Sequence, residues 1–523
     1  MLIAPPEIRK VWVLTFEYAG IKKLGGLGEA VKNISEGLSS LGFDVTVIMP
    51  SHGVEAGSEM EGVDCNGLRV GVDGSHYPYR IKFNLLRLGD KLKVVLVRGG
   101  DSRTSVILDD PYIYGRVEEK ACLLSRAVSC LTKAIGFPDV VHSNDWHTAL
   151  AAMSLKIEAE LNGLALPYLH QVHLPGSPRF SWHYLSPEWC ALPSEQHRVW
   201  RVCCHRLENT YDLWNSAGGN LEALAVVEAD GIASVSHSMV SELLRRYGEW
   251  LKPKTCVIYN STDWSLNEVV NYAITRYRYS GRDKLRWTLC KEVIERHKHV
   301  GRLSEGEALV LSTGRLTPQK GFEHLLRSFR KISDGLRLIL LGIPVGDVDY
   351  EDLLRQLLED LDGRAVLVTE RIEHQLYKLL HYVANAFAVP SVYEPFGIVA
   401  IEAMAVGTPP VVSDVGGLSE IVEDVRFSKE GCGVKVTPGS EEELGEALQN
   451  VAYMTLFSEE GRGLERITFK QLVEALKADP SAGHKVRDNC VRRVDENFRI
   501  HNTVAQTLKC YELSREMAYY RSL

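Results

Sequence analysis

The sequence lacks the long apolar runs that cross a membrane. No stretch approaches the about 18 consecutive apolar residues that mark a spanning helix. The first ten residues, which include Pro5, Pro6, Arg9 and Lys10, also lack the apolar core of a secretory signal peptide. The sequence therefore predicts neither a membrane protein nor an exported one.

Cysteine and histidine patterns that hold a metal ion are also missing. None of the 11 cysteines forms a Cys-x-x-Cys pair. His170 and His173 stand on a predicted strand, where residues three apart point to opposite faces. The acid-x-acid pair Asp347 and Asp349 stands apart from every other motif and is expected to be a solvated loop. We predict no metal and no other cofactor. Cysteines without a small disulfide-dense domain indicate a reducing, cytoplasmic location.

A strong excess of positive charge is absent as well. The 523 residues carry a net charge of -8, which argues against a nucleic acid partner but allows a local basic pocket for phosphate. With 45% hydrophobic and 24% charged residues, the composition is that of an ordinary soluble globular protein. The sequence is compatible with a homo-oligomer as well as with a monomer.

Short apolar runs alternate with helical patterns in two separate series. The first has predicted strands at residues 11–15, 45–49, 94–97, 139–143, 168–173, 231–235 and 256–259, and the second at 309–312, 338–341, 366–368, 387–389 and 411–413. This alternation predicts an α/β protein with two Rossmann-like, doubly wound domains and a cleft between them. We expect an N-terminal domain over 1–300, with helical insertions near 185–225 and 265–300. A C-terminal domain over 301–496 follows, and residues 497–523 form a helix returning to the first domain.

The most informative stretch follows a predicted strand of the second series. Glu394 lies on a loop at the strand's carboxyl end, where ligands of open α/β sheets bind. Phe396, Gly397 and Ile398 then open a helix whose free N–H groups attract an anion, and Glu402 lies farther along it. Two carboxylates beside an anion suit the hydroxyls that flank a diphosphate. The stretch predicts a nucleotide-sugar site, with an ordinary strand–loop–helix unit as the alternative.

Two further loops carry residues suited to phosphate. Lys23, Gly25 and Gly26 belong to a glycine-rich turn behind the first strand, where backbone amides can approach an anion and the lysine adds charge. Arg315 and Lys320 lie five residues apart at a strand's end, and a departing nucleoside diphosphate needs such positive charge. Taken alone, these segments are equally compatible with a tight turn and with solvated surface cations.

In this order, the motifs resemble those of the glycogen and starch synthases of glycosyltransferase family 5, especially the shorter archaeal type. The resemblance covers nearly the whole chain and thins at 185–305 and 455–490. The matching segments are Phe16-Glu17-Tyr18, Lys23 to Leu27, Asn144-Asp145-Trp146-His147, His173, Asn260, Gly314 to Lys320, Tyr393 to Gly397, Glu402 and Gly416-Gly417-Leu418.

The resemblance implies a GT-B fold and a function. It implies retaining, metal-free transfer of glucose from ADP-glucose or UDP-glucose to the end of an α-1,4-glucan. Arg315 and Lys320 would neutralise the diphosphate, while Glu394 contacts the donor sugar and Glu402 the ribose. Asp145 and His173 would line the sugar side. The other substrate-binding positions that it implies are Glu17, Lys23, Gly25, Gly26, His147, His170, Asn260, Phe396, Gly397, Ile398, Gly416 and Gly417.

Two histidines compete for one position of the family pattern. Counting from Pro167 favours His173, whereas counting back from Pro178 favours His170, and we take His173. The motif that usually begins with histidine begins here with Asn144.

Two other functions fit the motifs less well. A related retaining transferase could use a small acceptor, as sucrose- and trehalose-forming enzymes do. A glucan-binding regulator without activity is the other alternative. The presence of Arg315, Lys320, Glu394 and Glu402 argues against the regulator.

Overall fold

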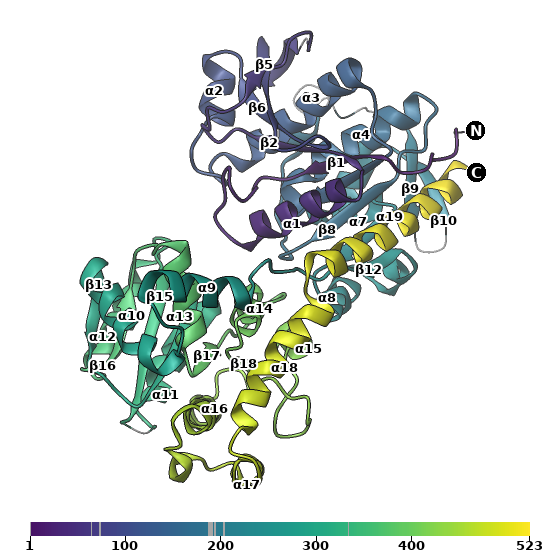
Figure 1. Cartoon of the computed structure of the whole chain (residues 1–523). Coiled ribbons are helices and arrows are strands. Elements are labelled where there is room, and N and C mark those ends of the chain that lie inside the picture. Colours follow the sequence, from purple (N-terminus) through teal and green to yellow (C-terminus); the bar gives the residue numbers. More distant parts are fainter. Residues whose placement is uncertain are drawn as a thin grey trace. The chain divides into compact units, whose positions relative to one another are not determined.

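The computed structural model describes residues 2–63, 65–72, 75–186, 192, 195–201, 204–332 and 334–523 (Figure 1). The chain divides into two compact units. Unit 1 comprises Met1–Asn260 and Ile500–Leu523, and unit 2 comprises Ser261–Arg499. Within the described ranges, no helix combines the length and the apolar character needed to cross a membrane.

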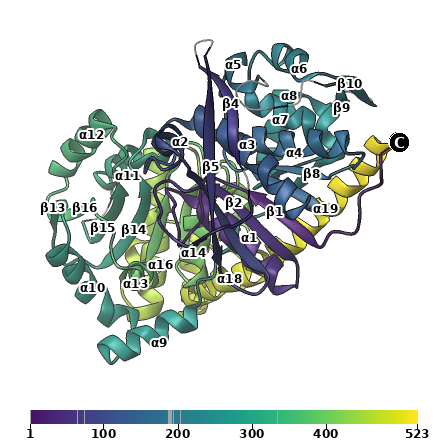
Figure 2. The same cartoon turned by 90° about the horizontal axis from the view of Figure 1, so that it is seen from above.

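Unit 1 is built on a ten-stranded, mostly parallel sheet. Its order is β12 (Thr255–Val257), β11 (Gly231–Ser234), β8 (Tyr168–Val172), β7 (Val140–Asn144), β1 (Lys10–Leu14), β2 (Asp44–Pro50), β6 (Leu92–Gly99), β5 (Ser75–Arg87) and β3 (Ser58–Glu59). Strand β4 (Asn66–Val72) pairs with β5, and Figure 2 shows the two side by side. The central strands are buried along nearly their whole length, because helices cover both faces of a parallel sheet.

Helices and one hairpin surround this sheet. The helices are α1 (Gly26–Ser40), α2 (Ser102–Leu108), α3 (Val117–Ile135), α4 (Ala149–Leu161), α5 (Trp182–Leu185), α6 (Thr210–Ser216), α7 (Leu221–Glu228), α8 (His237–Tyr247) and α19 (Ile500–Ser522), with short 3-10 turns at Trp146–Thr148 and Glu249–Lys254. Strands β9 (His197–Arg201) and β10 (Cys204–Glu208) form an antiparallel hairpin. The helical insertion predicted near 185–225 therefore also contains an antiparallel hairpin, alongside α6 and the start of α7. The described part of β10 is largely exposed and carries no apolar run to mark it as a strand.

Unit 2 has a seven-stranded sheet of its own. Its order is β13 (His299–Leu303), β16 (Arg364–Val368), β15 (Leu336–Ile343), β14 (Ala308–Arg315), β17 (Ala386–Val389), β18 (Pro410–Ser413) and β19 (Val434–Val436). Only the edge strand β13 runs antiparallel to its neighbour among the pairs described. The helices of this unit are α9 (Leu266–Tyr277), α10 (Arg282–Arg296), α11 (Phe322–Phe329), α12 (Val348–Glu359), α13 (His374–Val383), α14 (Ile398–Ala405), α15 (Leu418–Ile421), α16 (Glu441–Glu460), α17 (Lys470–Ala478) and α18 (Ala482–Asn497).

The two helices before β13 belong to unit 2. Arg286 of α10 is buried and donates to the Glu459 carboxylate at 2.5 Å, to Glu460 at 3.1 Å and to the Val383 carbonyl at 3.1 Å. The boundary predicted near residue 300 is therefore wrong, since the units divide after Asn260. The polar sequence of α10 gave no sign of these contacts, because its arginines find their partners far along the chain.

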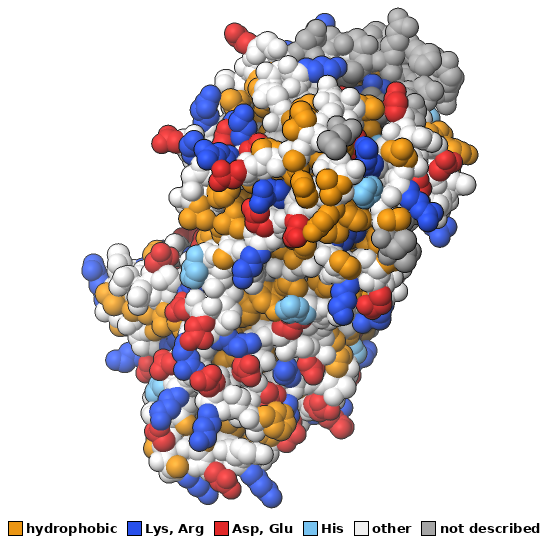
Figure 3. All heavy atoms as spheres, turned by 90° about the vertical axis from the view of Figure 1, so that its right-hand side faces the viewer, with side chains coloured by type: hydrophobic (Ala, Val, Ile, Leu, Met, Phe, Trp, Pro, Cys, Tyr) orange, Lys and Arg blue, Asp and Glu red, His pale blue; other side chains and the backbone are white. Residues whose placement is uncertain are grey.

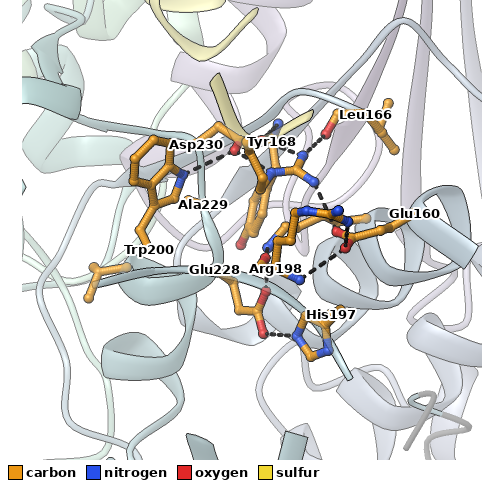
Figure 4. A network of polar contacts seen from close by, with 12 residues as sticks. Glu160, Leu166, Tyr168, His197, Arg198, Trp200, Glu228, Ala229 and Asp230 are labelled. Carbon is orange, nitrogen blue, oxygen red and sulfur yellow. Dashed lines mark hydrogen bonds and ion pairs between the residues drawn. The ribbon is translucent and has the colours of Figure 1, made fainter. Parts of the chain in front are cut away.

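Helix α19, yellow in Figure 1, packs on unit 1 through buried charges. Arg521 is fully buried and donates to Asp230 at 2.8 and 2.9 Å and to Glu160 at 3.1 Å. Glu160 also accepts from Arg198, and the Trp200 indole donates to Asp230 at 3.2 Å (Figure 4). These buried anions all have cationic or hydrogen-bonding partners, as a buried charge requires.

Two disulfides, Cys65–Cys130 and Cys256–Cys510, lie in unit 1. The second ties α19 to β12. The cysteine pattern gave no indication of these pairings. Disulfides also occur inside the cells of some thermophiles, so the cytoplasmic location stays a prediction. On the face shown in Figure 3, basic and acidic side chains are interspersed, in keeping with the net charge of -8.

Candidate functional site

The carboxyl edge of the unit 2 sheet brings a cation and a carboxylate together. Lys320 ends a 3-10 turn (Pro318–Lys320) behind β14, and its Nζ lies 2.5 Å from Oε2 of Glu394, on the loop after β17. The Ser391 hydroxyl donates to the same oxygen at 3.1 Å. Arg315 is the last residue of β14. Because Glu394 is only 8% exposed, the charge pair is largely shielded from water.

Helix α14 begins immediately beyond this loop. Gly397 caps it with φ 111°, a left-handed conformation that favours glycine, and a Cβ there would lie 2.4 Å from Leu418. Ile398 is the first helical residue, and Glu402 lies on the same helix. Phe396 is buried, with its ring centroid 5.9 Å from that of Phe498. The positive end of the helix dipole therefore lies next to the Glu394 loop.

Gly416 and Gly417 support the Glu394 loop from behind. A Cβ on Gly416 would lie 1.9 Å from the Glu394 carbonyl oxygen, and one on Gly417 would lie 2.5 Å from Cα of Phe396. The Gly417 N–H donates to the Glu394 carbonyl at 3.1 Å. Close backbone packing thus requires both glycines, whatever their role toward a ligand.

In unit 1, Glu17 organises the glycine-rich turn. Its Oε2 accepts the backbone N–H groups of Leu24 at 2.7 Å and Gly25 at 2.9 Å, and its Oε1 accepts the Tyr114 hydroxyl. Gly25 caps α1, of which Gly26 is the first residue. Lys23 forms an ion pair with Glu29 in the first turn of that helix. The carboxylate predicted to bind substrate is thus engaged in holding the turn.

Asn144 and His173 meet at the carboxyl ends of β7 and β8. The Asn144 amide donates to the Leu14 carbonyl at 3.0 Å, which leaves its oxygen to accept from Nε2 of His173 at 2.9 Å. Burial lowers the pKa of His173 to about 3. The imidazole is therefore neutral at neutral pH and carries its proton on Nε2, with Nδ1 as its acceptor.

Asp145 holds the backbone next to His173. Its Oδ1 accepts the N–H groups of His173 at 2.6 Å and Leu174 at 3.2 Å. Burial raises the pKa of this carboxyl to about 7, against the effect of those two hydrogen bonds. Asp145 also has φ 57°, which non-glycine residues rarely adopt. Such strain is characteristic of functional sites.

Three predicted polar residues of unit 1 have buried atoms without a hydrogen-bond partner. These are Nε2 of His147, Nε2 of His170 and Oδ1 of Asn260. His170 lies inside β8 and its Nδ1 contacts the Ser143 hydroxyl at 2.7 Å. Burial lowers the pKa of His147 and of His170 to about 3. An unpaired buried nitrogen is costly, so these atoms are candidates for ligand contacts.

The predicted residues thus form two groups, one in each unit, and their neighbours include residues that the motifs did not indicate. Ser391, Tyr114 and Glu222 each contact a site loop. Tyr114 and Glu222 contact partners 97 and 46 residues away, so no local signal marks them, whereas Ser391 lies only three residues before its partner Glu394. Among the residues that the structure describes, no cluster of three or more His, Cys, Asp or Glu could hold a metal ion. Asp347 caps α12 by accepting the Tyr350 N–H.

Sequence comparisons match both units to known families. Residues 10–253 match the starch synthase catalytic domain, and residues 293–453 match the glycosyl transferases group 1 domain. A glycogen synthase of Thermotoga petrophila is 28% identical over 455 residues, which cover 81% of this chain and 87% of the relative. The chain is a glycosyltransferase that is similar to the glycogen and starch synthases.

Solved structures show the fold of this glycosyltransferase to be GT-B. The catalytic domain of starch synthase IV from Arabidopsis thaliana, bound to ADP and acarbose, is 18% identical with a TM-score of 0.69, over 98% of this chain and all of that one. Sucrose-phosphate synthase from Thermosynechococcus elongatus is 19% identical with a TM-score of 0.57, over 96% and 98% of the two chains. The predicted fold class is confirmed.

Proposed function

We propose that this glycosyltransferase elongates an α-1,4-glucan with glucose taken from ADP-glucose or UDP-glucose. The observation that carries the proposal is the pairing of Lys320 with Glu394 beside Arg315 and the start of α14. Cations and a helix N-terminus suit the diphosphate of the donor. Glu394, beside them, suits a hydroxyl of the donor sugar, and Glu402 suits the ribose.

The chemistry follows from the charge that develops on the leaving group. As the bond between glucose and diphosphate breaks, negative charge accumulates on the diphosphate, and Arg315 and Lys320 stabilise it. Glu394 orients the sugar and does not form a covalent intermediate. The leaving diphosphate accepts the proton of the acceptor hydroxyl. The glucosyl group is transferred with retention of configuration, and the chain needs neither a metal ion nor a dedicated base.

Unit 1 supplies the acceptor side of the reaction. His173 and the unpaired Nε2 of His147 are suited to sugar hydroxyls, because both rings are neutral and buried at neutral pH. Lys23 carries a charge suited to the diphosphate once it leaves Glu29. We expect the enzyme to act in the cytoplasm, without a nucleic acid or membrane partner.

Product analysis tests this proposal. The protein is incubated with radiolabelled ADP-glucose or UDP-glucose and with glycogen, maltose, fructose 6-phosphate or glucose 6-phosphate as acceptor. We expect label in glycogen, released as short α-1,4-linked oligosaccharides by α-amylase. Label in a disaccharide phosphate alone would establish the small-acceptor alternative, and absence of transfer from both donors would contradict the proposal. The donor that is used preferentially shows which nucleotide base the protein recognises.

A further inference from the structure

Glu222 is the second residue of α7, and its side chain is fully buried. Its carboxylate joins α7 to two other parts of the fold. Its Oε2 accepts the backbone N–H of Gly176 at 2.8 Å, and its Oε1 accepts the Tyr247 hydroxyl of α8 at 2.7 Å. Gly176 lies on the loop after β8, three residues beyond His173. Glu222 therefore fixes the far end of the loop that begins with His173.

The near end of the same loop is fixed by Asp145, through the N–H groups of His173 and Leu174. Trp146 adds a packing constraint, since a Cβ on Gly176 would lie 3.1 Å from its indole ring. Two buried carboxylates and one indole thus hold a span of only a few residues. This is more restraint than a connecting loop at the protein surface needs.

Burying Asp145 and Glu222 near each other is electrostatically unfavourable, so stability alone does not explain the pair. Burial raises the pKa of Glu222 to about 7, and the nearby charges of Glu222 and Glu17 add to the raised pKa of Asp145. A neutral acceptor could make the same hydrogen bonds without burying a second acid near the first. Perturbed carboxyl groups of this kind gather at functional sites.

We propose that Glu222, held by Tyr247, is a positioning residue for transfer: it fixes the backbone at Gly176 and thereby places the His173 ring against the sugar. The inference rests on the proposed function, in which His173 is on the sugar side. Glu222 itself touches no substrate. Small displacements of a positioned group are sufficient to slow a reaction markedly.

Three variants separate this role from a purely structural one. Glu222→Leu removes the acceptor for the Gly176 N–H, whereas Glu222→Gln preserves it. Tyr247→Phe removes only the hydrogen bond that Oε1 of Glu222 accepts from α8. We expect kcat to fall at least about tenfold for Glu222→Leu and roughly twofold to fivefold for Tyr247→Phe. Glu222→Gln should stay within about threefold of the unmodified protein, because its amide oxygen still accepts the Gly176 N–H.

The measurements are kcat and the calorimetric Kd for ADP and UDP, at a temperature where each variant is folded. We expect the nucleotide Kd to be unchanged, because the residues proposed to hold the diphosphate in unit 2 are untouched. Normal kcat in Glu222→Leu, or equal losses of kcat and nucleotide affinity, would overturn the inference. If Glu222→Leu does not fold, normal kcat in Tyr247→Phe overturns it.

The outcome is independent of the acceptor. Each kcat is expressed relative to the unmodified protein on whichever acceptor that protein uses. A failure of glucan elongation therefore appears in the unmodified protein, whereas a failure of the Glu222 inference appears only in the variants.

Discussion

Lys320 and Glu394 form an ion pair of 2.5 Å although they lie 74 residues apart in the sequence. The loops after β14 and β17 bring them together, because these two strands are parallel neighbours whose carboxyl ends share one edge. The two charges neutralise each other in this pair. Under the proposed function, a bound diphosphate would compete with Glu394 for the lysine and would couple donor binding to the orientation of the carboxylate.

Removing the lysine should impair catalysis without unfolding the protein. We expect Lys320→Ala to lower kcat/KM by roughly 10²–10³-fold, the usual cost of losing one charge contact in the transition state. The matched control is Lys331→Ala, which removes an exposed lysine of the same unit and should have no effect. Steady-state kinetics with normal turnover in Lys320→Ala would show that Lys320 has no diphosphate role.

A methyl group behind the glycine-rich turn should displace Lys23. A Cβ on Gly28 would lie 2.7 Å from Cβ of Lys23 and 3.2 Å from the Ala19 nitrogen. We expect Gly28→Ala to lower kcat/KM roughly tenfold by moving the turn. Gly89→Ala is the control, since nothing lies within 4 Å of its Cβ. Equal kinetics for the two variants would contradict a role for the geometry of the turn.

Arg521 should contribute strongly to the stability of unit 1. Arg521→Ala leaves Asp230 buried without its main cationic partner, so we expect the free energy of unfolding to fall by about 3–5 kcal/mol. Arg515→Ala, on the exposed side of the same helix, should cost less than about 1 kcal/mol. Denaturant titrations followed by circular dichroism make the comparison. Similar midpoints for both variants would show that α19 is held by packing and the disulfide alone.

Acid should destabilise unit 1 below about pH 6.5. Burial lowers the pKa of five histidines of unit 1 from the ordinary value of 6.5 to about 3 or 4, so each is neutral in the folded protein but takes up a proton on unfolding. The stability that depends on their neutral form is complete above pH 6.5 and is lost as the pH falls toward their folded pKa values. They are His52, His147, His170 and His173 at about 3, and His142 at about 4.

Two carboxyls act in the opposite direction. The raised pKa values of Asp145 and Glu222, both about 7, favour the folded state at low pH and cease to do so as the pH rises toward 7. Among these seven groups, the five histidines outweigh the two acids, which leaves about three protons taken up by them on unfolding near pH 5.5. At about 1.4 kcal/mol per proton and pH unit, the free energy of unfolding should fall by roughly 4 kcal/mol per pH unit. Urea midpoints that stay constant between pH 7.5 and 5 would contradict this.

Much of the fold could be predicted because buried parallel strands are apolar along their whole length. The predicted strand at 387–389 corresponds to β17, Ala386–Val389, and that at 411–413 corresponds to β18, Pro410–Ser413. The hairpin of β9 and β10 was not predicted, because its second strand is largely exposed and has no apolar run. Helix α10 was assigned to the wrong domain because Arg286 is buried only through partners at residues 383, 459 and 460.

The sequence by itself determined where the loops at the strand ends lie and which charged residues they carry. Lys23, Arg315, Lys320 and Glu394 are visible without coordinates, since each follows a strand or opens a helix. Local periodicity encodes these elements, because it depends only on near neighbours.

Only the tertiary structure decided what those residues contact. In the folded chain, the Glu17 carboxylate accepts two backbone N–H groups and the hydroxyl of Tyr114, which is 97 residues away. The tertiary structure gave Gly416 a packing role against the Glu394 carbonyl, and it brought Glu222 to Gly176, 46 residues earlier. The physical reason is that a buried polar group needs a hydrogen-bond partner, and it pairs with whichever group the folded chain places beside it. That partner is set by the topology of the sheet, which no local pattern contains.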